Sequence, residues 1–121
     1  MEIQTVSIVG LGALGTLFGH HLAGRLPAGA LRVVADAARV ERYRREGVFS
    51  NGQPCAFAYE TPDASVPPAD LVLVAVKSTQ LAEALPAIRS QLGPDTLLVS
   101  LLNGITSEQV LGDTFGVQRV V

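Results

Sequence analysis

Apolar residues along this chain form two kinds of pattern, short runs rich in β-branched residues and longer stretches with helical spacing. The short runs fall at residues 3–9, 31–35, 57–60, 70–76 and 96–102. The helical stretches fall at residues 13–26, 37–46, 80–92 and 107–111. The clearest run, at 70–76, is apolar on both faces, which is typical of a strand buried in a parallel sheet. Strands that alternate with helices in this order predict an α/β fold with a doubly wound parallel sheet.

Turn and capping signals refine these elements. Gly47 follows the 37–46 stretch and predicts its C-cap. Asn51-Gly52 predicts a two-residue hairpin that leads into the strand at 57–60. Pro86 lies inside the 80–92 pattern, so we expect either a kink there or a helix that restarts. Residues 119–121 have the pattern of a sixth strand that is only opening.

The first strand leads directly into three spaced glycines. Gly10 permits a tight turn, Gly12 lets the backbone approach a pyrophosphate, and Gly15 lets the following helix pack close to the strand. A helix that begins here points free N–H groups at the phosphates. The turn therefore predicts a dinucleotide site formed by Gly10, Leu11, Gly12, Ala13, Leu14 and Gly15. The alternative is that the glycines serve close packing alone.

The length of 121 residues is enough for one hydrophobic core and too short for two ordinary domains. We therefore expect a single domain at residues 1–121. With 48% hydrophobic and 17% charged residues, the chain has the composition of a compact globular domain and not that of a disordered protein. A net charge of -2 and scattered basic residues argue against a nucleic-acid or anionic-membrane partner. No apolar run approaches the ~20 residues of a membrane span. The single cysteine, Cys55, cannot form an internal disulfide and has no neighbouring ligands for a metal site. A reducing compartment fits this best, so we expect the protein in the cytoplasm.

Polar residues follow three of the predicted strands: Asp36, Lys77 and the pair Asn103-Gly104. In an open parallel sheet, ligands bind at the carboxyl ends of the strands, near the point where the strand order reverses. Lys77 is then placed to meet a cofactor ribose or a substrate anion, and Asn103 to form a hydrogen bond beside the nicotinamide. The alternatives are a solvated lysine at a strand end and a plain Asn-Gly turn.

Asp36 has two interpretations. It lies about 20 residues after Gly15, where a carboxylate binds the adenosine ribose 2′-hydroxyl of NAD and repels the 2′-phosphate of NADP unless an arginine compensates. Arg39, in the first turn of the next helix, is the candidate arginine. Asp36 is equally an N-cap of that helix, and the two roles can coexist. Three further arginines are assigned to the solvated face of the helix: Arg42, Arg44 and Arg45. Packing or interface roles are expected for His20 and His21.

Three segments together resemble the amino-terminal domain of the ketopantoate (2-dehydropantoate) reductase family. They are Ile-Val-Gly-Leu-Gly-Ala-Leu-Gly-Thr-Leu-Phe at 8–18, Ala-Asp-Leu-Val-Leu-Val-Ala-Val-Lys-Ser-Thr-Gln at 69–80 and Leu-Leu-Asn-Gly-Ile at 101–105. The resemblance implies a Rossmann-like domain and the NADPH-dependent reduction of a 2-keto acid to a 2-hydroxy acid, in pantothenate biosynthesis for authentic members. It also implies pyrophosphate at Gly10 to Gly15, cofactor contact by Lys77, and contact of Asn103 with cofactor and substrate.

The chain departs from the family pattern in two respects. The family commonly places its arginine for the 2′-phosphate just after the second strand, whereas Asp36 precedes Arg39 here, so NADH stays open beside NADPH. The family's proton-donating lysine lies in a helical carboxyl-terminal domain outside residues 1–121, so no catalytic residue is assigned in this chain. We expect these residues to bind cofactor and to catalyse poorly alone, as a fragment that ends within a sixth strand.

Two other functions stay open. One is a regulatory module that senses a nucleotide without turning it over, although such a module has no need of Lys77 and Asn103 at the nicotinamide end. The other is the cofactor domain of a different dehydrogenase, which acts on another hydroxy acid or on an imine. Self-association into a homodimer through an apolar surface is left open as well.

Overall fold

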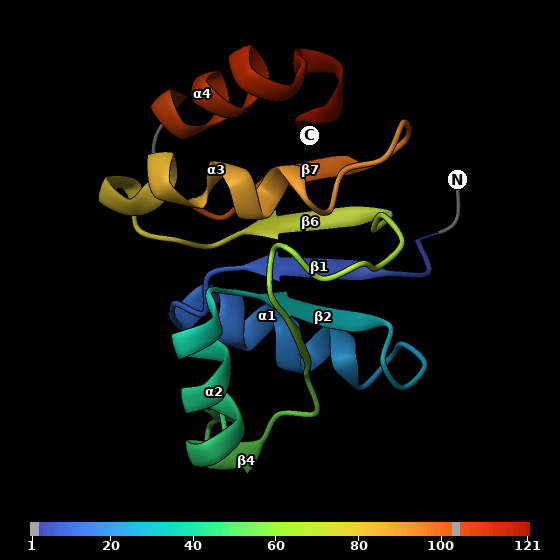
Figure 1. The fold of residues 1–121 in the computed structure, drawn as a ribbon, viewed down its shortest axis with the longest axis vertical. Coiled ribbons are helices and arrows are strands. Elements are labelled where there is room, and N and C mark those ends of the chain that lie inside the picture. Colours follow the sequence, from blue (N-terminus) through green and yellow to red (C-terminus); the bar gives the residue numbers. More distant parts are fainter. Residues whose placement is uncertain (1–2, 103–104) are drawn as a thin grey trace.

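The computed structural model describes residues 3–102 and 105–121, and its centre is a parallel sheet. Across the sheet the strands are β5 (Ala58–Glu60), β2 (Leu31–Val34), β1 (Val6–Val9), β6 (Leu71–Val74) and β7 (Leu97–Ser100) (Figure 1). All four strand pairs are parallel. The chain builds outward from β1 through β2 to β5 and then returns to β6 on the other side of β1. The predicted doubly wound parallel sheet is confirmed, and its order reverses between β1 and β6.

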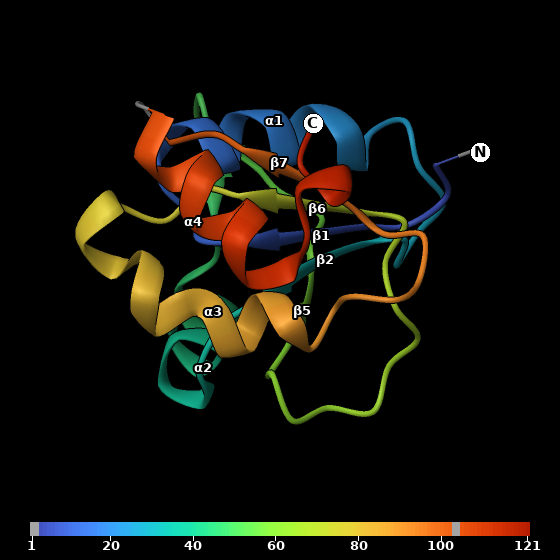
Figure 2. The ribbon, with the colours of Figure 1, turned by 90° about the horizontal axis from the view of Figure 1, so that it is seen from above.

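Helices cover both faces of this sheet (Figure 2). α1 (Ala13–Ala23) packs on one face, and α3 (Leu81–Arg89) and α4 (Ile105–Phe115) pack on the opposite face. α2 (Ala37–Glu46) lies beyond β2 and contacts the edge strand β5. Two 3-10 turns complete the described chain, η1 (Ser78–Gln80) before α3 and η2 (Val117–Arg119) after α4.

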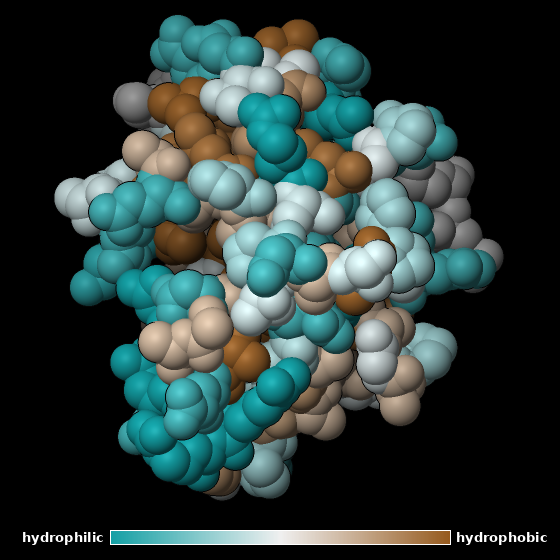
Figure 3. All heavy atoms as spheres, viewed as in Figure 1, coloured by the Kyte–Doolittle hydropathy of each residue, from teal (hydrophilic) through white to brown (hydrophobic). Residues whose placement is uncertain are grey.

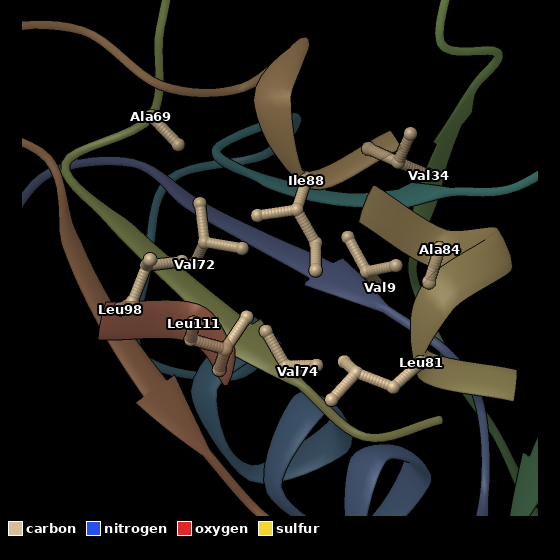
Figure 4. Packing of buried hydrophobic residues seen from close by; sticks show 10 residues of the cluster. All are labelled: Val9, Val34, Ala69, Val72, Val74, Leu81, Ala84, Ile88, Leu98 and Leu111. Atoms are coloured by element: carbon tan, nitrogen blue, oxygen red, sulfur yellow. The ribbon is translucent and has the colours of Figure 1, made fainter. Parts of the chain in front are cut away.

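Two apolar clusters, one on each face, hold the helices to the sheet. Figure 4 shows ten buried residues of the cluster beneath α3 and α4, among them Ile88 and Leu111, each 0% exposed. On the α1 side, Val6 and Ile8 pack with residues of β2 and β6. Val9 faces the other way, into the first cluster. β1 buries side chains on both faces, so its apolar residues do not follow the alternation of a half-exposed strand, and even Ser7 is 0% exposed.

Two local predictions are confirmed in detail. α2 runs from Ala37 to Glu46 and ends where Gly47, at φ 78°, donates its N–H to the carbonyl of Tyr43. Asn51 and Gly52 have φ values of 50° and 78° and join β3 (Phe49–Ser50) to β4 (Gln53–Pro54) as an antiparallel hairpin. Positive φ at both central residues is the geometry that favours Asn-Gly in such turns.

The prediction at Pro86 is corrected in part, because α3 does not restart there. The helix is continuous from Leu81 to Arg89 with Pro86 inside it. The Pro86 carbonyl still accepts a hydrogen bond from the Ser90 N–H. The helix therefore loses only the bond that a backbone N–H at residue 86 would donate, because proline has no such group. Leu81 and Ile88, buried on either side of the proline, hold both parts of α3 against the sheet.

The predicted helix at 107–111 is too short, since α4 extends from Ile105 to Phe115. Gly112-Asp113 has the composition of a helix end, but the residue with positive φ comes later, at Gly116 with φ 109°. Leu111 is fully buried and Phe115 packs against the same cluster. Tertiary packing therefore carries the helix past its local stop signal.

The last described residues return to the sheet beside β7. Val120 forms an isolated parallel bridge with Leu98, and the Val121 N–H donates to the Leu98 carbonyl at 2.9 Å. Arg119 lies in η2 instead. The strand expected at 119–121 is thus represented by a single bridged residue.

We predict that acid releases the entry of β1 from β6. The carboxylate of Asp70 accepts hydrogen bonds from the N–H groups of Gln4 at 2.9 Å and Thr5 at 3.1 Å, and these bonds hold the pKa of Asp70 below its usual value. A lowered pKa means that the stabilisation is present above the unfolded value of about 3.9 and is lost as the pH falls through the folded value. Hydrogen-exchange protection of both amides should therefore fall in that range.

The Val6 amide serves as the internal control for this measurement. It donates to the carbonyl of Ala30 at 3.0 Å, an acceptor that does not titrate. Its protection should stay constant while that of Gln4 and Thr5 falls. Equal losses at all three amides would show that the whole domain opens and would contradict a local role for Asp70.

Candidate functional site

A groove of about 430 Å³ lies at the carboxyl ends of β1, β2 and β6. Its floor is the turn Gly10 to Gly12, one wall comes from the start of α2, and the other comes from η1 and α3. The strand ends that form it lie at the left of Figure 1. Figure 3 shows a hydrophilic surface over α2 and hydrophobic atoms exposed between α2 and α3. The groove therefore opens at the reversal point of the sheet, where ligands of this fold class bind.

Gly10 makes the turn at the end of β1 and lies against the loop that follows β6. Its φ is 98°, and a Cβ placed on it would lie 2.6 Å from the Val76 nitrogen and 2.8 Å from the Ala75 carbonyl carbon. Only glycine fits this combination of backbone angle and contact without strain. The tight turn predicted here is confirmed.

Gly15 brings α1 close to the same loop. A Cβ on Gly15 would lie 2.6 Å from the Gly10 carbonyl oxygen and 2.8 Å from the Ala75 Cβ. The close packing predicted at this glycine is confirmed. Gly19, one turn further along α1, was not singled out from the sequence, yet a Cβ there would lie 2.6 Å from the Ile8 Cδ1. Its spacing of four residues from Gly15 is the signal that places both on one helix face.

The amino end of α1 opens toward the groove. Gly12 is the N-cap, so no side chain caps the helix, and the first turn contains no acidic residue. The N–H groups of Ala13, Leu14 and Gly15 have no acceptor within the helix, which leaves partial positive charge at this end. Backbone N–H groups in this arrangement suit phosphate oxygens. Of the apolar residues in the turn, Leu11 packs partly into the core while Leu14 is exposed.

Asp36 caps α2 and also lines the groove. Its Oδ1 accepts from the Arg39 N–H at 2.8 Å, and its Oδ2 accepts from the Arg39 Nη1 at 2.7 Å. The backbone bond from Arg39 is the main cause that lowers the pKa of the Asp36 carboxyl, and the Arg39 charge adds to it. The N-cap interpretation is confirmed, and both residues also lie on the groove wall.

Lys77 follows β6 and lines the groove opposite α2. Its side chain is exposed, and its carbonyl accepts from the Gln80 N–H at 2.8 Å, which starts η1. Asn103 and Gly104 lie outside the described residues. The sequence prediction for Asn103, contact with both cofactor and substrate, thus stays a prediction. The described chain reaches Leu102 on one side and Ile105 on the other.

Several groove residues were not predicted from the sequence. Arg42 was assigned to a solvated face, but it lines the groove one turn after Arg39, and its guanidinium lies 5.4 Å from the centre of the Tyr43 ring. The spacing of three residues from Arg39 was the available signal. On η1 and α3 the missed residues are Gln80 and Glu83, which line the groove on the wall opposite α2.

The other basic residues of the first two helices lie elsewhere. Arg44 donates to the Tyr59 carbonyl at 3.0 Å, and Arg45 pairs with Glu41 at 3.7 Å. The His20 ring contacts the Gln53 side chain at 3.2 Å, which ties α1 to the hairpin, and His21 accepts from Arg25. Both are hydrogen bonds at the surface, so the packing or interface roles expected for the histidines stay a prediction.

Neither a metal site nor a membrane-spanning helix is found within residues 3–102 and 105–121. No three His, Cys, Asp or Glu side chains gather there in a way that could hold a metal ion. No helix of this part of the chain has the length and apolar character needed to cross a membrane.

The fold has counterparts in solved structures. A PanE/ApbA family ketopantoate reductase from Ralstonia eutropha JMP134 is 30% identical with a TM-score of 0.73 and covers 96% of this chain. The 2-dehydropantoate 2-reductase from Geobacter metallireducens GS-15 is 26% identical with a TM-score of 0.74, also over 96%. A D-mandelate dehydrogenase solved with NADH is 25% identical with a TM-score of 0.72.

The chain is shorter than these neighbours. It spans 39% of each of the two reductases and 37% of the mandelate dehydrogenase. A family model described as "Ketopantoate reductase PanE/ApbA" matches residues 6–121. Because that match covers the whole sheet, its helices and the groove, this chain belongs to the ketopantoate reductase family.

Proposed function

We propose that this chain is the cofactor-binding domain of an NAD(P)H-dependent reductase that converts a 2-keto acid to a 2-hydroxy acid. The observation that carries the proposal is the position of the groove, which joins the glycine turn, the end of β2 and the loop after β6 at the reversal point of the sheet. The pyrophosphate lies over Gly10 to Gly15 and the adenosine ribose beside Asp36 and Arg39. Lys77 contacts the cofactor from the opposite wall.

Membership of the ketopantoate reductase family supports both the reduction of a 2-keto acid and the use of a nicotinamide cofactor. A reduced nicotinamide supplies a hydride to the keto carbon, and the domain's own part is to orient that cofactor. NADPH is the proposed cofactor, because Arg39 and Arg42 both line the groove at the ribose end. NADH stays an alternative through Asp36. Ketopantoate is the proposed substrate, which places the reaction in pantothenate biosynthesis in the cytoplasm.

The proton for the product hydroxyl comes from outside these residues in this proposal. As a carbonyl takes up hydride, its oxygen gains negative charge and needs an acid. The family resemblance assigns that acid to a lysine of a helical carboxyl-terminal domain. The mandelate dehydrogenase neighbour supports a second candidate substrate class, another 2-keto acid, because a related cofactor domain serves a different hydroxy acid there.

Calorimetric titration of the chain with NADPH tests the cofactor site, and Gly12→Ala sharpens the test. Gly12 has an ordinary φ of -70°, and an added Cβ would lie 3.2 Å from the Ala75 carbonyl oxygen, so we expect the fold to survive. The same Cβ stands where the pyrophosphate approaches the backbone. The affinity for NADPH should fall by at least about tenfold, a loss of roughly 1.4 kcal/mol.

Gly24→Ala is the matched control at the other end of α1. Gly24 is the C-cap with φ -73°, and a Cβ there would meet nothing closer than the His21 carbonyl oxygen at 3.6 Å. Its NADPH affinity should equal that of the unaltered chain. No binding by the unaltered chain at millimolar NADPH and NADH would refute the proposed function. Equal affinity in the Gly12 and Gly24 variants would refute the placement of the pyrophosphate.

A further inference from the structure

Asp36 and Arg39 form an ion pair at the place where the two nicotinamide dinucleotides differ. One carboxylate oxygen, Oδ1, accepts the backbone N–H of Arg39 and belongs to the helix cap. The other oxygen, Oδ2, accepts from the Arg39 side chain, at 2.7 Å. The cap bond and the side-chain bond thus use different oxygens, so the side chain of Arg39 can leave without undoing the cap.

The side-chain bond is easily exchanged for another partner. The Arg39 and Asp36 side chains are 50% and 53% exposed. Exposed ion pairs of this kind contribute little to stability, because water and salt screen them. A ligand that offers either residue a comparable partner can therefore open the pair at little cost.

We propose that this pair is an exchangeable latch that lets one groove accept both NADH and NADPH, an inference that rests on the proposed function. With NADH, the ribose 2′-hydroxyl donates to the Asp36 Oδ2. With NADPH, Arg39 turns from Asp36 to the 2′-phosphate, while Oδ1 keeps the cap of α2. Asp36 and Arg39 are in this way the residues that determine cofactor specificity.

The charges around the latch favour balance between the two cofactors. Asp36 repels a 2′-phosphate, but Arg39 and Arg42 both line the groove on the same side of α2. The opposite wall carries Glu83 and Lys77, whose charges offset each other. Two cations against one carboxylate near the phosphate leave a net attraction, which compensates the loss of the Asp36–Arg39 bond. The affinities for NADH and NADPH should then lie within about tenfold of each other.

Two substitutions that preserve the helix cap separate the two halves of the latch. Asparagine caps helices as well as aspartate, so Asp36→Asn keeps the fold and removes the negative charge. It should shift the ratio of affinities toward NADPH by about tenfold or more. Arg39→Gln keeps a long polar side chain and should weaken NADPH binding by about tenfold while NADH binding changes less than about threefold. Rising salt should weaken NADPH more than NADH.

Titration with both dinucleotides, in the unaltered chain and in each variant, decides the question. Arg45→Gln is the matched control, since Arg45 pairs with Glu41 away from the groove, and it should leave both affinities unchanged. A preference above tenfold for either cofactor in the unaltered chain would overturn the latch. Equal weakening of NADH and NADPH by Arg39→Gln would overturn it too. Failure of the unaltered chain to bind either dinucleotide would instead refute the proposed function, and the latch with it.

Discussion

Replacing Gly10 by alanine should destabilise the domain by about 3 kcal/mol or more and abolish cofactor binding, since strain and overpacking add at this position. Gly10 has φ 98°, which an L side chain rarely adopts. The new Cβ would also lie 2.6 Å from the Val76 nitrogen and 2.7 Å from its Cγ1. Backbone atoms of the loop after β6 cannot move away without displacing Lys77. Urea unfolding measures the stability, and titration with NADPH measures the binding.

Gly29→Ala separates strain from packing. Gly29 has φ 81°, but a Cβ there would meet nothing within 4 Å. Replacing Gly29 by alanine should lower the free energy of unfolding by only about 1–2 kcal/mol, because a side chain is strained in the left-handed region. NADPH binding should persist. If the two alanine variants lost the same stability, the close contact between the glycine turn and the loop after β6 would be irrelevant, and the account of Gly10 would be wrong.

Replacing Asn103 by alanine should lower turnover about 100-fold in a protein of family length that contains this chain, which is the usual cost of removing one hydrogen-bond donor to a reacting oxygen. Asn103 comes soon after β7 in the sequence, and the family resemblance implies that it contacts cofactor and substrate. The readout is kcat/KM for a 2-keto acid beside the Kd of NADPH. The Kd should change less than about threefold, a shift below 1 kcal/mol.

The split between turnover and binding makes this prediction specific. Loss of turnover with retained cofactor binding supports a role at the reacting carbonyl. Unchanged turnover would remove Asn103 from the site. A large loss of NADPH affinity would mean that Asn103 acts on the cofactor alone, as it would in a nucleotide sensor without turnover.

Much of the fold could be predicted because local signals and tertiary packing agree. β1 and β6 are apolar on both faces, and helices cover both faces of the sheet. α2 has its N-cap Asp36 and its C-cap Gly47 in the sequence, so both of its ends were predicted to the residue. The structure overrides the local signal at Pro86 and in α4, where buried leucine and isoleucine side chains and the partly buried Phe115 hold a helix that its own sequence would break.

The candidate site was predictable where it lies on strand ends and less so elsewhere. Gly10, Asp36 and Lys77 come just after the carboxyl ends of strands, so the rule for parallel sheets places them on the groove. Arg42 and Glu83 belong to α2 and α3, which line the same groove. How far apart two helices lie depends on how each packs on the sheet, and the local sequence pattern does not predict that. That the helix-cap bond and the side-chain bond use different oxygens of Asp36 is likewise visible only from atomic positions.

In the proposed complex, a nicotinamide dinucleotide lies along the groove with its pyrophosphate over the glycine turn. Backbone amide chemical shifts of the labelled chain, recorded during titration with NADPH, test this arrangement residue by residue. We expect the largest changes at the amides of Leu11 to Gly15, with further changes at Arg39, Lys77 and Gln80 and none at the hairpin residues Asn51 and Gly52. Binding that shifted the hairpin and left the amides of Leu11 to Gly15 unchanged would contradict it.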